Sequence, residues 1–242
     1  MTKIALILAP HPDDESIIGL LPLRLREECG FQVWVVPVTL GRREDRRAAR
    51  AKELRAACRA LDFRLWIPMD VAAGVATMKE LIAVLDELRP SVVFLPHAQD
   101  GHATHRASHW MGLAAMDVAR QKSFHAVETE YWHPLERPNL MVAASAAQLK
   151  TLRRALACHK GEVARNDYAA RLPAWMIDNV RRGAELVGGA GAAAPKIARA
   201  TLYRARRRIG GKWRPEFRGG KIIASRAELA ALSARWEPVG QS

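Results

Sequence analysis

Two short segments of the chain combine histidines with carboxylates. Residues 10–15 read PHPDDE, and residues 96–106 read PHAQDGHATHR. Two histidines and one carboxylate form a common ligand set for a catalytic zinc ion, with one position left for water, and such ligands also suit Fe²⁺. A metal-bound water loses its proton near neutral pH, a neighbouring carboxylate can accept that proton, and a second histidine can stabilise an oxyanion. The two segments therefore contain the groups that amide hydrolysis needs.

Alternating strands and helices must bring these two segments together. Apolar runs predict strands over residues 3–10, 31–41, 64–70 and 91–97, each followed by a helical pattern. This alternation predicts an α/β fold, a Rossmann-like three-layer sandwich with a mostly parallel sheet. Because ligands bind beyond the carboxyl ends of the strands in such sheets, the two polar segments should meet at one rim. No GxGxxG sequence follows the first strand, so the dinucleotide-binding pattern is missing there.

The remaining chain divides into two expected regions. Further strands are predicted over residues 126–134 and 139–145, and a helix over residues 146–160. We expect residues 1–160 to form a catalytic α/β core. We expect residues 161–242 to form a basic, helical C-terminal subregion that closes over the pocket of this core.

The two polar segments also resemble a known family. The sequence APHPDDE, followed by GHATHRA at residues 101–107, resembles the PIG-L/LmbE-like deacetylases, whose hallmarks are an HPDDE motif and a later HPDHxA-type segment. The resemblance covers about residues 3–160, including the order of strands and helices, and it implies an LmbE-like fold. It also implies roles for five residues: metal ligation by His11, Asp14 and His105, general base catalysis by Asp13, and stabilisation of the oxyanion by His102.

This chain departs from the family pattern between the two later histidines. The Pro-Asp pair of the family is Ala103–Thr104 here. Because a threonine cannot hold an imidazolium charged as an aspartate does, we expect a lowered pKa for His102, which would act as a neutral hydrogen-bond donor. Asp100 could replace the missing carboxylate if the loop folds back.

Five further residues are expected to bind substrate. Arg50 and Asp70 lie where members of the family place groups that contact sugar hydroxyls or brace the site. Asp100 stands where the family often has a tyrosine. Tyr131 and Trp132 could stack on a sugar ring, although packing in the core would explain these two aromatic residues equally well.

The charge of the chain is concentrated near its end. Of the formal net charge of +13, the last 52 residues supply +9, with 12 Lys/Arg and 3 Asp/Glu. This excess suits either a solvated surface or an anionic partner, and it favours an amino-sugar substrate with an anionic part, or a peripheral membrane contact, over nucleic acid. The run RREDRR (residues 42–47) usually indicates a solvated surface, but it follows the second strand at the same rim and could meet substrate.

Cysteine content and hydropathy constrain the location of the protein. Three widely spaced cysteines do not suit a disulfide framework and favour a reducing compartment. The first apolar run is short and is followed at once by acidic residues, so it does not resemble a signal peptide. No apolar run is long enough to span a membrane. We therefore expect a cytoplasmic protein, with peripheral membrane association allowed.

These observations lead to one expected function and one alternative. We expect a zinc-dependent hydrolase that removes the acetyl group from an N-acetyl amino sugar, an N-acetylglucosaminyl conjugate, by attack of a metal-bound water on the amide carbonyl. One zinc ion per chain is expected, with Fe²⁺ as the other candidate. The alternative is a catalytically altered protein of the same fold that binds carbohydrate or nucleic acid, which the Ala103–Thr104 departure favours slightly.

Overall fold

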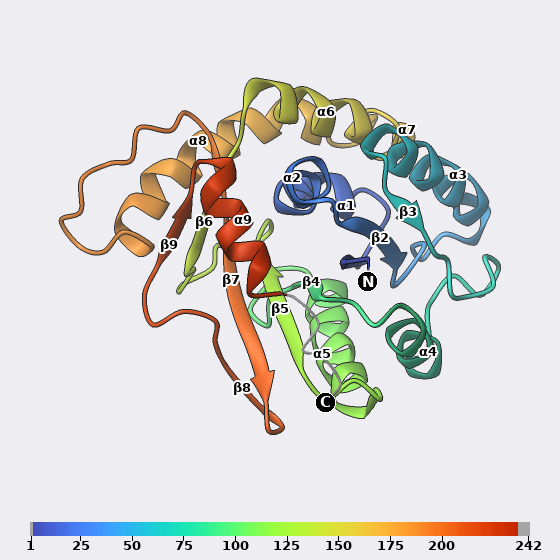
Figure 1. Ribbon diagram of the computed structural model, residues 1–242. Helices are drawn as coiled ribbons and strands as arrows, with labels where there is room; N and C mark the ends of the chain where they lie inside the picture. Colours follow the sequence, from blue (N-terminus) through green and yellow to red (C-terminus); the bar gives the residue numbers. More distant parts are fainter. Residues whose placement is uncertain (1, 237–242) are drawn as a thin grey trace.

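One mixed sheet organises the part of the chain that the computed structural model describes, residues 2–236 (Figure 1). The nine strands described there follow the order β3–β2–β1–β4–β5–β7–β6–β9, and β8 pairs with β7. Their bounds are β1 Ile4–Ala9, β2 Gln32–Pro37, β3 Arg64–Leu65, β4 Val92–Pro96, β5 Phe124–Thr129, β6 Leu140–Ala143, β7 Ala200–Ile209, β8 Lys212–Pro215 and β9 Lys221–Ile223. Strands β1 to β5 pair in parallel, as do β6 and β9, which confirms the expected mostly parallel sheet.

Helices cover both faces of this sheet. Their bounds are α1 Asp14–Ile17, α2 Leu20–Cys29, α3 Glu44–Leu61, α4 Met78–Leu88, α5 Ala103–Val118, α6 Ala146–Leu156, α7 Lys160–Val163, α8 Tyr168–Leu186 and α9 Arg226–Ala234. Alternate residues of β1 enter two apolar clusters: Ile7 packs among residues of α2, α3, α6, α8 and α9, and Leu8 among residues of α4 and α5. Burial on both faces explains why β1 is an unbroken apolar run. None of the helices described for residues 2–236 has the length and hydropathy to cross a bilayer.

The polar rim lies where the direction of strand connection reverses. From β1 the chain continues to β2 on one side of β1, whereas β4 pairs with β1 on its other side. In parallel α/β sheets, this reversal leaves a crevice beyond the carboxyl ends of the two central strands. The loops that follow β1 and β4 carry PHPDDE and PHAQDGHATHR, so both polar segments open into this crevice.

Several strands are shorter than the sequence predicts. Of the predicted strand 31–41, β2 ends at Pro37. Of the predicted strand 64–70, only Arg64–Leu65 pairs with β2, and the backbone amide of Trp66 adds one more hydrogen bond, to Val35. Pro68 then follows, and a proline cannot donate to a strand ladder. Of the predicted strand 126–134, β5 ends at Thr129.

The C-terminal region contributes to the sheet as well as to its helical layers. Residues 161–242 were expected to be a helical subregion, and within the described residues they supply α8 and α9 together with β7, β8 and β9. Strand β7 lies between β5 and β6 and is antiparallel to both. Because Phe124, the first residue of β5, pairs with Arg208, the basic end of β7 lies at the amino edge of the parallel strands, opposite the polar rim.

Candidate active site

Three side chains from the two rim segments lie in contact. His11 follows β1, Asp14 begins α1, and His105 lies in the first turn of α5. His11 Nδ1 is 3.3 Å from His105 Nε2 and 3.6 Å from Asp14 Oδ2, and His105 Nε2 is 3.4 Å from the same Asp14 oxygen. Residues separated by 94 positions in the sequence thus form one cluster of donor atoms.

The separations of these three atoms fit a tetrahedral zinc site. With bonds of about 2.0–2.2 Å to nitrogen and carboxylate oxygen, tetrahedral angles place neighbouring ligand atoms about 3.3–3.6 Å apart. The three observed separations of 3.3, 3.4 and 3.6 Å fall in this range. Two imidazoles and one carboxylate are also a donor set that suits zinc or Fe²⁺ better than Mg²⁺ or Ca²⁺.

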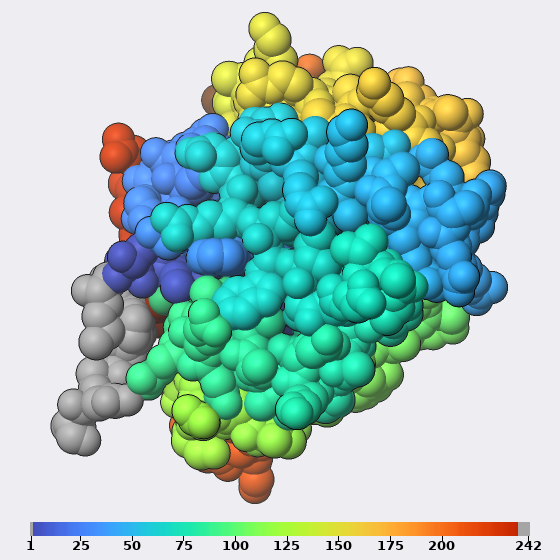
Figure 2. All heavy atoms as spheres, turned by 90° about the vertical axis from the view of Figure 1, so that its right-hand side faces the viewer, coloured from blue at the N-terminus to red at the C-terminus, as the bar shows by residue number. Residues whose placement is uncertain are grey.

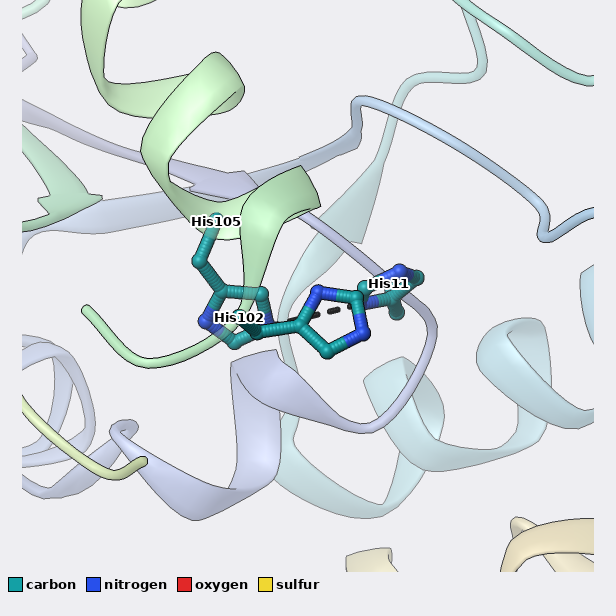
Figure 3. A group of neighbouring side chains, drawn as sticks. All are labelled: His11, His102 and His105. Atoms are coloured by element: carbon teal, nitrogen blue, oxygen red, sulfur yellow. Dashed lines mark hydrogen bonds between the residues drawn. The ribbon is translucent and has the colours of Figure 1, made fainter. Parts of the chain in front are cut away.

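His102 is the third histidine of the cluster. One ring nitrogen from each of His11, His102 and His105 lies within 4.8 Å of the other two. Figure 3 shows the three rings gathered between the loop after β1 and the start of α5. The triangle that includes Asp14 is tighter than this one. Asp14 is therefore the stronger candidate for the third ligand atom, and the exposed imidazole of His102 lines the cavity.

Asp100 orients the loop that carries the two histidines. Its Oδ1 accepts a hydrogen bond from the backbone amide of His102 at 2.8 Å, and its Oδ2 lies 3.2 Å from His105 Nδ1. A proton on Nδ1 of His105 directed at this carboxylate leaves the lone pair of Nε2 free to face His11 and Asp14. Carboxylates commonly hold metal-binding histidines in this way.

The charges within the cluster favour binding of a cation. Burial alone would raise the pKa of Asp14, but His105 and His11 outweigh it and lower this pKa to about 2. Burial alone would lower the pKa of His105, but the carboxylates of Asp14 and Asp100 raise it above its usual value. A divalent cation would replace the proton that these carboxylates attract to His105.

Asp13 adopts a backbone conformation that is unusual for a residue with a side chain. Its φ is 119° and its ψ is −30°. The backbone amide of Asp13 donates to Glu15 Oε2 at 2.9 Å, and Glu15 Oε1 accepts hydrogen bonds from Ser16 Oγ and His159 Nε2. Glu15 is fully buried, so this hydrogen-bond network holds the backbone of Asp13 in its strained conformation.

The strained turn places the carboxylate of Asp13 at the cavity. Burial raises the pKa of Asp13 well above its usual value, and the nearby carboxylates of Asp14, Glu15 and Glu162 raise it further. A carboxylate in such surroundings binds a proton more readily than a solvated one. Asp13 can therefore accept a proton more readily than a solvated aspartate and can later donate it.

His102 is held as a neutral donor. It is the N-cap of α5, and its Nδ1 accepts a hydrogen bond from the backbone amide of Thr104 at 3.2 Å. In the neutral ring the proton is therefore on Nε2. Burial lowers the pKa of His102, and His11 and His105 lower it further. The lowered pKa agrees with the expectation from Ala103–Thr104, and Asp100 contacts the backbone of His102 rather than its ring.

A cavity of about 930 Å³ contains the cluster. Of the residues expected from the sequence, it is lined by His11, Asp13, Asp14, His102, His105, Arg50 and Trp132. Three expected substrate contacts do not line it: Asp70 is exposed in another loop, Asp100 is buried beneath His105, and Tyr131 packs against Tyr168 and Trp175.

The sequence did not single out every residue of the cavity wall. Glu162, Arg165 and Tyr168 belong to the region that was expected to close over the pocket, but no local pattern singled out these three residues. The run RREDRR does reach the cavity, through Arg42, Arg43, Arg46 and Arg47, and its position after the second strand was the available signal.

The fold and this site define a Rossmann-like α/β protein with a histidine–carboxylate centre at the switch point of its sheet. Residues 6–116 match the family described as PIG-L: GlcNAc-PI de-N-acetylase. This match confirms the resemblance to the PIG-L/LmbE-like deacetylases over residues 6–116.

Solved structures share the fold over most of the chain. The conserved protein TT1542 from Thermus thermophilus has a TM-score of 0.62 and 21% identity, over 84% of this chain and 94% of that one. The N,N'-diacetylchitobiose deacetylase from Pyrococcus horikoshii has 0.62 and 15%, over 84% and 83%. GalB, the 4-carboxy-2-hydroxymuconate hydratase from Pseudomonas putida, has 0.63 and 18%, over 84% and 96%. Since these proteins include a deacetylase and a hydratase, the fold alone does not determine the reaction. A comparison with curated protein sequences gave no match.

Proposed function

We propose that the protein is a metal-dependent N-deacetylase that hydrolyses the acetamide of an N-acetylglucosaminyl conjugate, with zinc as the metal. The observation that carries the proposal is the triangle of His11 Nδ1, Asp14 Oδ2 and His105 Nε2, with sides of 3.3–3.6 Å, at the cavity that Asp13 and His102 also line. The PIG-L match over residues 6–116 supports the same reaction class.

Each polar side chain then has one task. A zinc ion at this site would lower the pKa of a water bound to it and would place a positive charge near the reacting carbonyl. The carboxylate of Asp13 accepts the proton of the attacking water and later returns it to the nitrogen of the leaving amine. The raised pKa of Asp13 suits both steps. His102 Nε2–H donates to the carbonyl oxygen and stabilises the negative charge that develops there.

The cavity wall supplies groups for the sugar. Trp132 lines the cavity with about half of its side chain exposed, so its ring is free to stack on a pyranose. Arg50 lies beside the strained turn and donates to the carbonyl oxygen of Pro12 at 3.2 Å, so it braces the site as well as lining it. Asp100 acts on the reaction through His105, because its carboxylate is buried beneath that ring.

A screen for released acetate tests this proposal. Zinc-loaded protein is incubated with a panel of N-acetylglucosaminyl compounds. Asp13→Asn should lower kcat by about 10²–10⁴ and His102→Gln by about 10²–10³, with zinc content unchanged. His105→Ala should instead lose the metal. Acetate release that persists in Asp13→Asn would remove Asp13 from its role, and an absence of acetate release across the panel would refute the proposed reaction.

We also propose that the enzyme is cytoplasmic. Cys29, Cys58 and Cys158 are all free thiols, as is usual in the reducing cytoplasm.

A further inference from the structure

One wall of the cavity is crowded with arginines. Six guanidinium groups line it, against three carboxylates, those of Asp13, Asp14 and Glu162. The arginines are Arg42, Arg43, Arg46, Arg47, Arg50 and Arg165. Five of them come from the segment that leads into α3 and from its first two turns, and the sixth follows α7. Hydrolysis of an amide does not require this excess of positive charge, so the arginines must have another role.

Two of these arginines hold the cavity together. Arg47 donates to the carbonyl oxygens of Gly41 and Ala72, and Arg50 donates to that of Pro12. Their side chains are only 12% and 15% exposed. Gly74 passes so close to Arg47 that a Cβ there would lie 2.3 Å from its Nε. Arg47 and Arg50 are therefore fixed by backbone contacts.

The other arginines near α3 are available to a ligand. Arg42 is exposed and forms no ion pair within residues 2–236. Arg43 pairs with Asp45, but both side chains are largely exposed, at 75% and 62%. Arg46 lies 3.4 Å from Glu53. The Arg43–Asp45 pair is exposed and contributes little free energy, so Arg43 can exchange its partner at small cost. Glu53 is only 14% exposed, but the Arg46 side chain is 37% exposed and lines the cavity, so part of its guanidinium stays accessible while it pairs.

This part of the wall can be reached from outside. Figure 2 shows the residues around 42–50 at the surface, beside residues of the 150–170 segment. Arg46 approaches Gly161 so closely that a Cβ at this glycine would lie 2.0 Å from the Arg46 guanidinium. The exposed arginines thus border the cavity at its mouth, where a group attached to a bound sugar would emerge.

From these contacts we propose that Arg42, Arg43 and Arg46 bind an anionic group, a phosphate or a carboxylate, carried by the substrate on the side of the sugar away from its acetamide. The inference rests on the proposed deacetylation, since it names the class of conjugate that this site accepts. Guanidinium groups present paired N–H donors that match phosphate and carboxylate oxygens, which is why arginine is the usual residue for these anions.

The other basic cluster of the chain does not serve this purpose. Arg204 and Arg206 pair with Glu128, and Arg208 pairs with Asp117. All three belong to β7: Arg208 lies opposite Phe124 at the edge of the sheet away from the cavity, and Arg204 and Arg206 are held by the buried Glu128. We therefore place recognition of the anion in the segment around α3 rather than in β7. The exposed Lys212 and Arg214 of β8 supply a charge-matched control.

Steady-state kinetics on three substrates test the inference. The substrates are N-acetylglucosamine 1-phosphate, the carboxymethyl N-acetylglucosaminide and the neutral methyl N-acetylglucosaminide. In Arg42→Gln/Arg46→Gln, the ratio of kcat/KM for an anionic substrate to that for the neutral substrate should fall by about tenfold for each guanidinium that reaches the anion, mostly through KM. The phosphate and carboxylate substrates report which anion the wall prefers. Lys212→Gln/Arg214→Gln should leave every ratio unchanged.

Two kinetic outcomes overturn the inference without touching the proposed reaction: equal use of neutral and anionic substrates by the unmodified protein, or an unchanged ratio in Arg42→Gln/Arg46→Gln. If no substrate releases acetate, the proposed reaction is refuted. Calorimetric titration of the zinc-loaded protein with glucosamine 1-phosphate then tests whether the arginines bind an anionic group. Binding that is weakened in Arg42→Gln/Arg46→Gln but not in Lys212→Gln/Arg214→Gln supports the anion site, and equal binding by the two variants overturns it.

Discussion

The strained backbone of Asp13 makes a prediction that separates stability from activity. A residue with a side chain at φ 119° and ψ −30° is destabilised by about 1–3 kcal/mol. Glycine adopts positive φ without this cost. However, glycine makes the unfolded chain more flexible, which lowers the free energy of unfolding by about 0.4–1 kcal/mol. The net gain in free energy of unfolding for Asp13→Gly is therefore about 0–2.6 kcal/mol, with a central value of about 1.3 kcal/mol. For a domain of this size, the central value corresponds to a rise in Tm of about 3–5 °C.

Two further substitutions divide this gain into its physical parts. Asp13→Ala removes the carboxylate but keeps the Cβ, so the difference between the Gly and Ala variants measures the backbone cost alone. Asp13→Asn keeps both the side chain and the conformation and removes only the charge. The side chain of Asp13 forms no cap hydrogen bond with α1, so truncating it costs none there.

Thermal unfolding of chelator-treated protein is the suitable assay, because changes in metal affinity then do not alter Tm. All three variants should lose acetate release on the zinc-loaded protein. A Tm for Asp13→Gly at or below that of Asp13→Ala would refute the reasoning, because it would show that the positive φ of residue 13 carries no cost that glycine relieves.

Three other predictions concern metal affinity and the response to pH. Chelation should lower Tm by about 5–11 °C when the unchelated sample holds zinc at about 100 times its dissociation constant, and no shift would contradict a zinc site. Asp100→Asn should weaken zinc binding about 10–100-fold, measured by competition with a chelating dye, because His105 loses its carboxylate partner. Burial alone would raise the pKa of Glu216, but His125 and then Arg235 lower it below its usual value. Glu216 therefore stabilises the fold at pH values above its unfolded pKa. This stabilisation is lost as the pH falls through the lower pKa of the folded state. Glu216→Gln should therefore reduce the loss of Tm between about pH 6 and pH 3, and an unchanged profile would exclude this contribution.

The meeting of the two polar segments could be predicted because it depends on local patterns. Each segment follows a short apolar run, and the parallel arrangement of those runs sends both to one rim. This reasoning brings the two segments together, whereas the choice of His105 as the partner of His11 rests on the family resemblance. The predicted helix 146–160 begins at the first residue of α6, where Ser145 forms a capping box with Gln148, but it runs past the observed end at Leu156.

The features that escaped prediction depend on contacts between distant segments. His159 reaches Glu15 across 144 positions, and nothing near either residue signals the pair. The sequence around Arg204 and Arg206 suggests a solvated basic tail, yet both side chains pair with the fully buried Glu128 of the neighbouring strand. Charge content cannot distinguish these cases, because long arginine stems allow a strand to be both basic and packed.

The position of β7 has a consequence for how the protein is made. Because β7 pairs with β5 on one side and β6 on the other, a nascent chain that has emerged only as far as residue 160 would present both of those strands with open ladders. Unpaired edges of this kind invite pairing with other chains. The proposed metal ligands are synthesised early, but the sheet that supports them is completed only when the last third of the polypeptide has been made. The candidate site therefore depends on β7, a strand that is synthesised late. Residues 1–160 alone are not expected to fold.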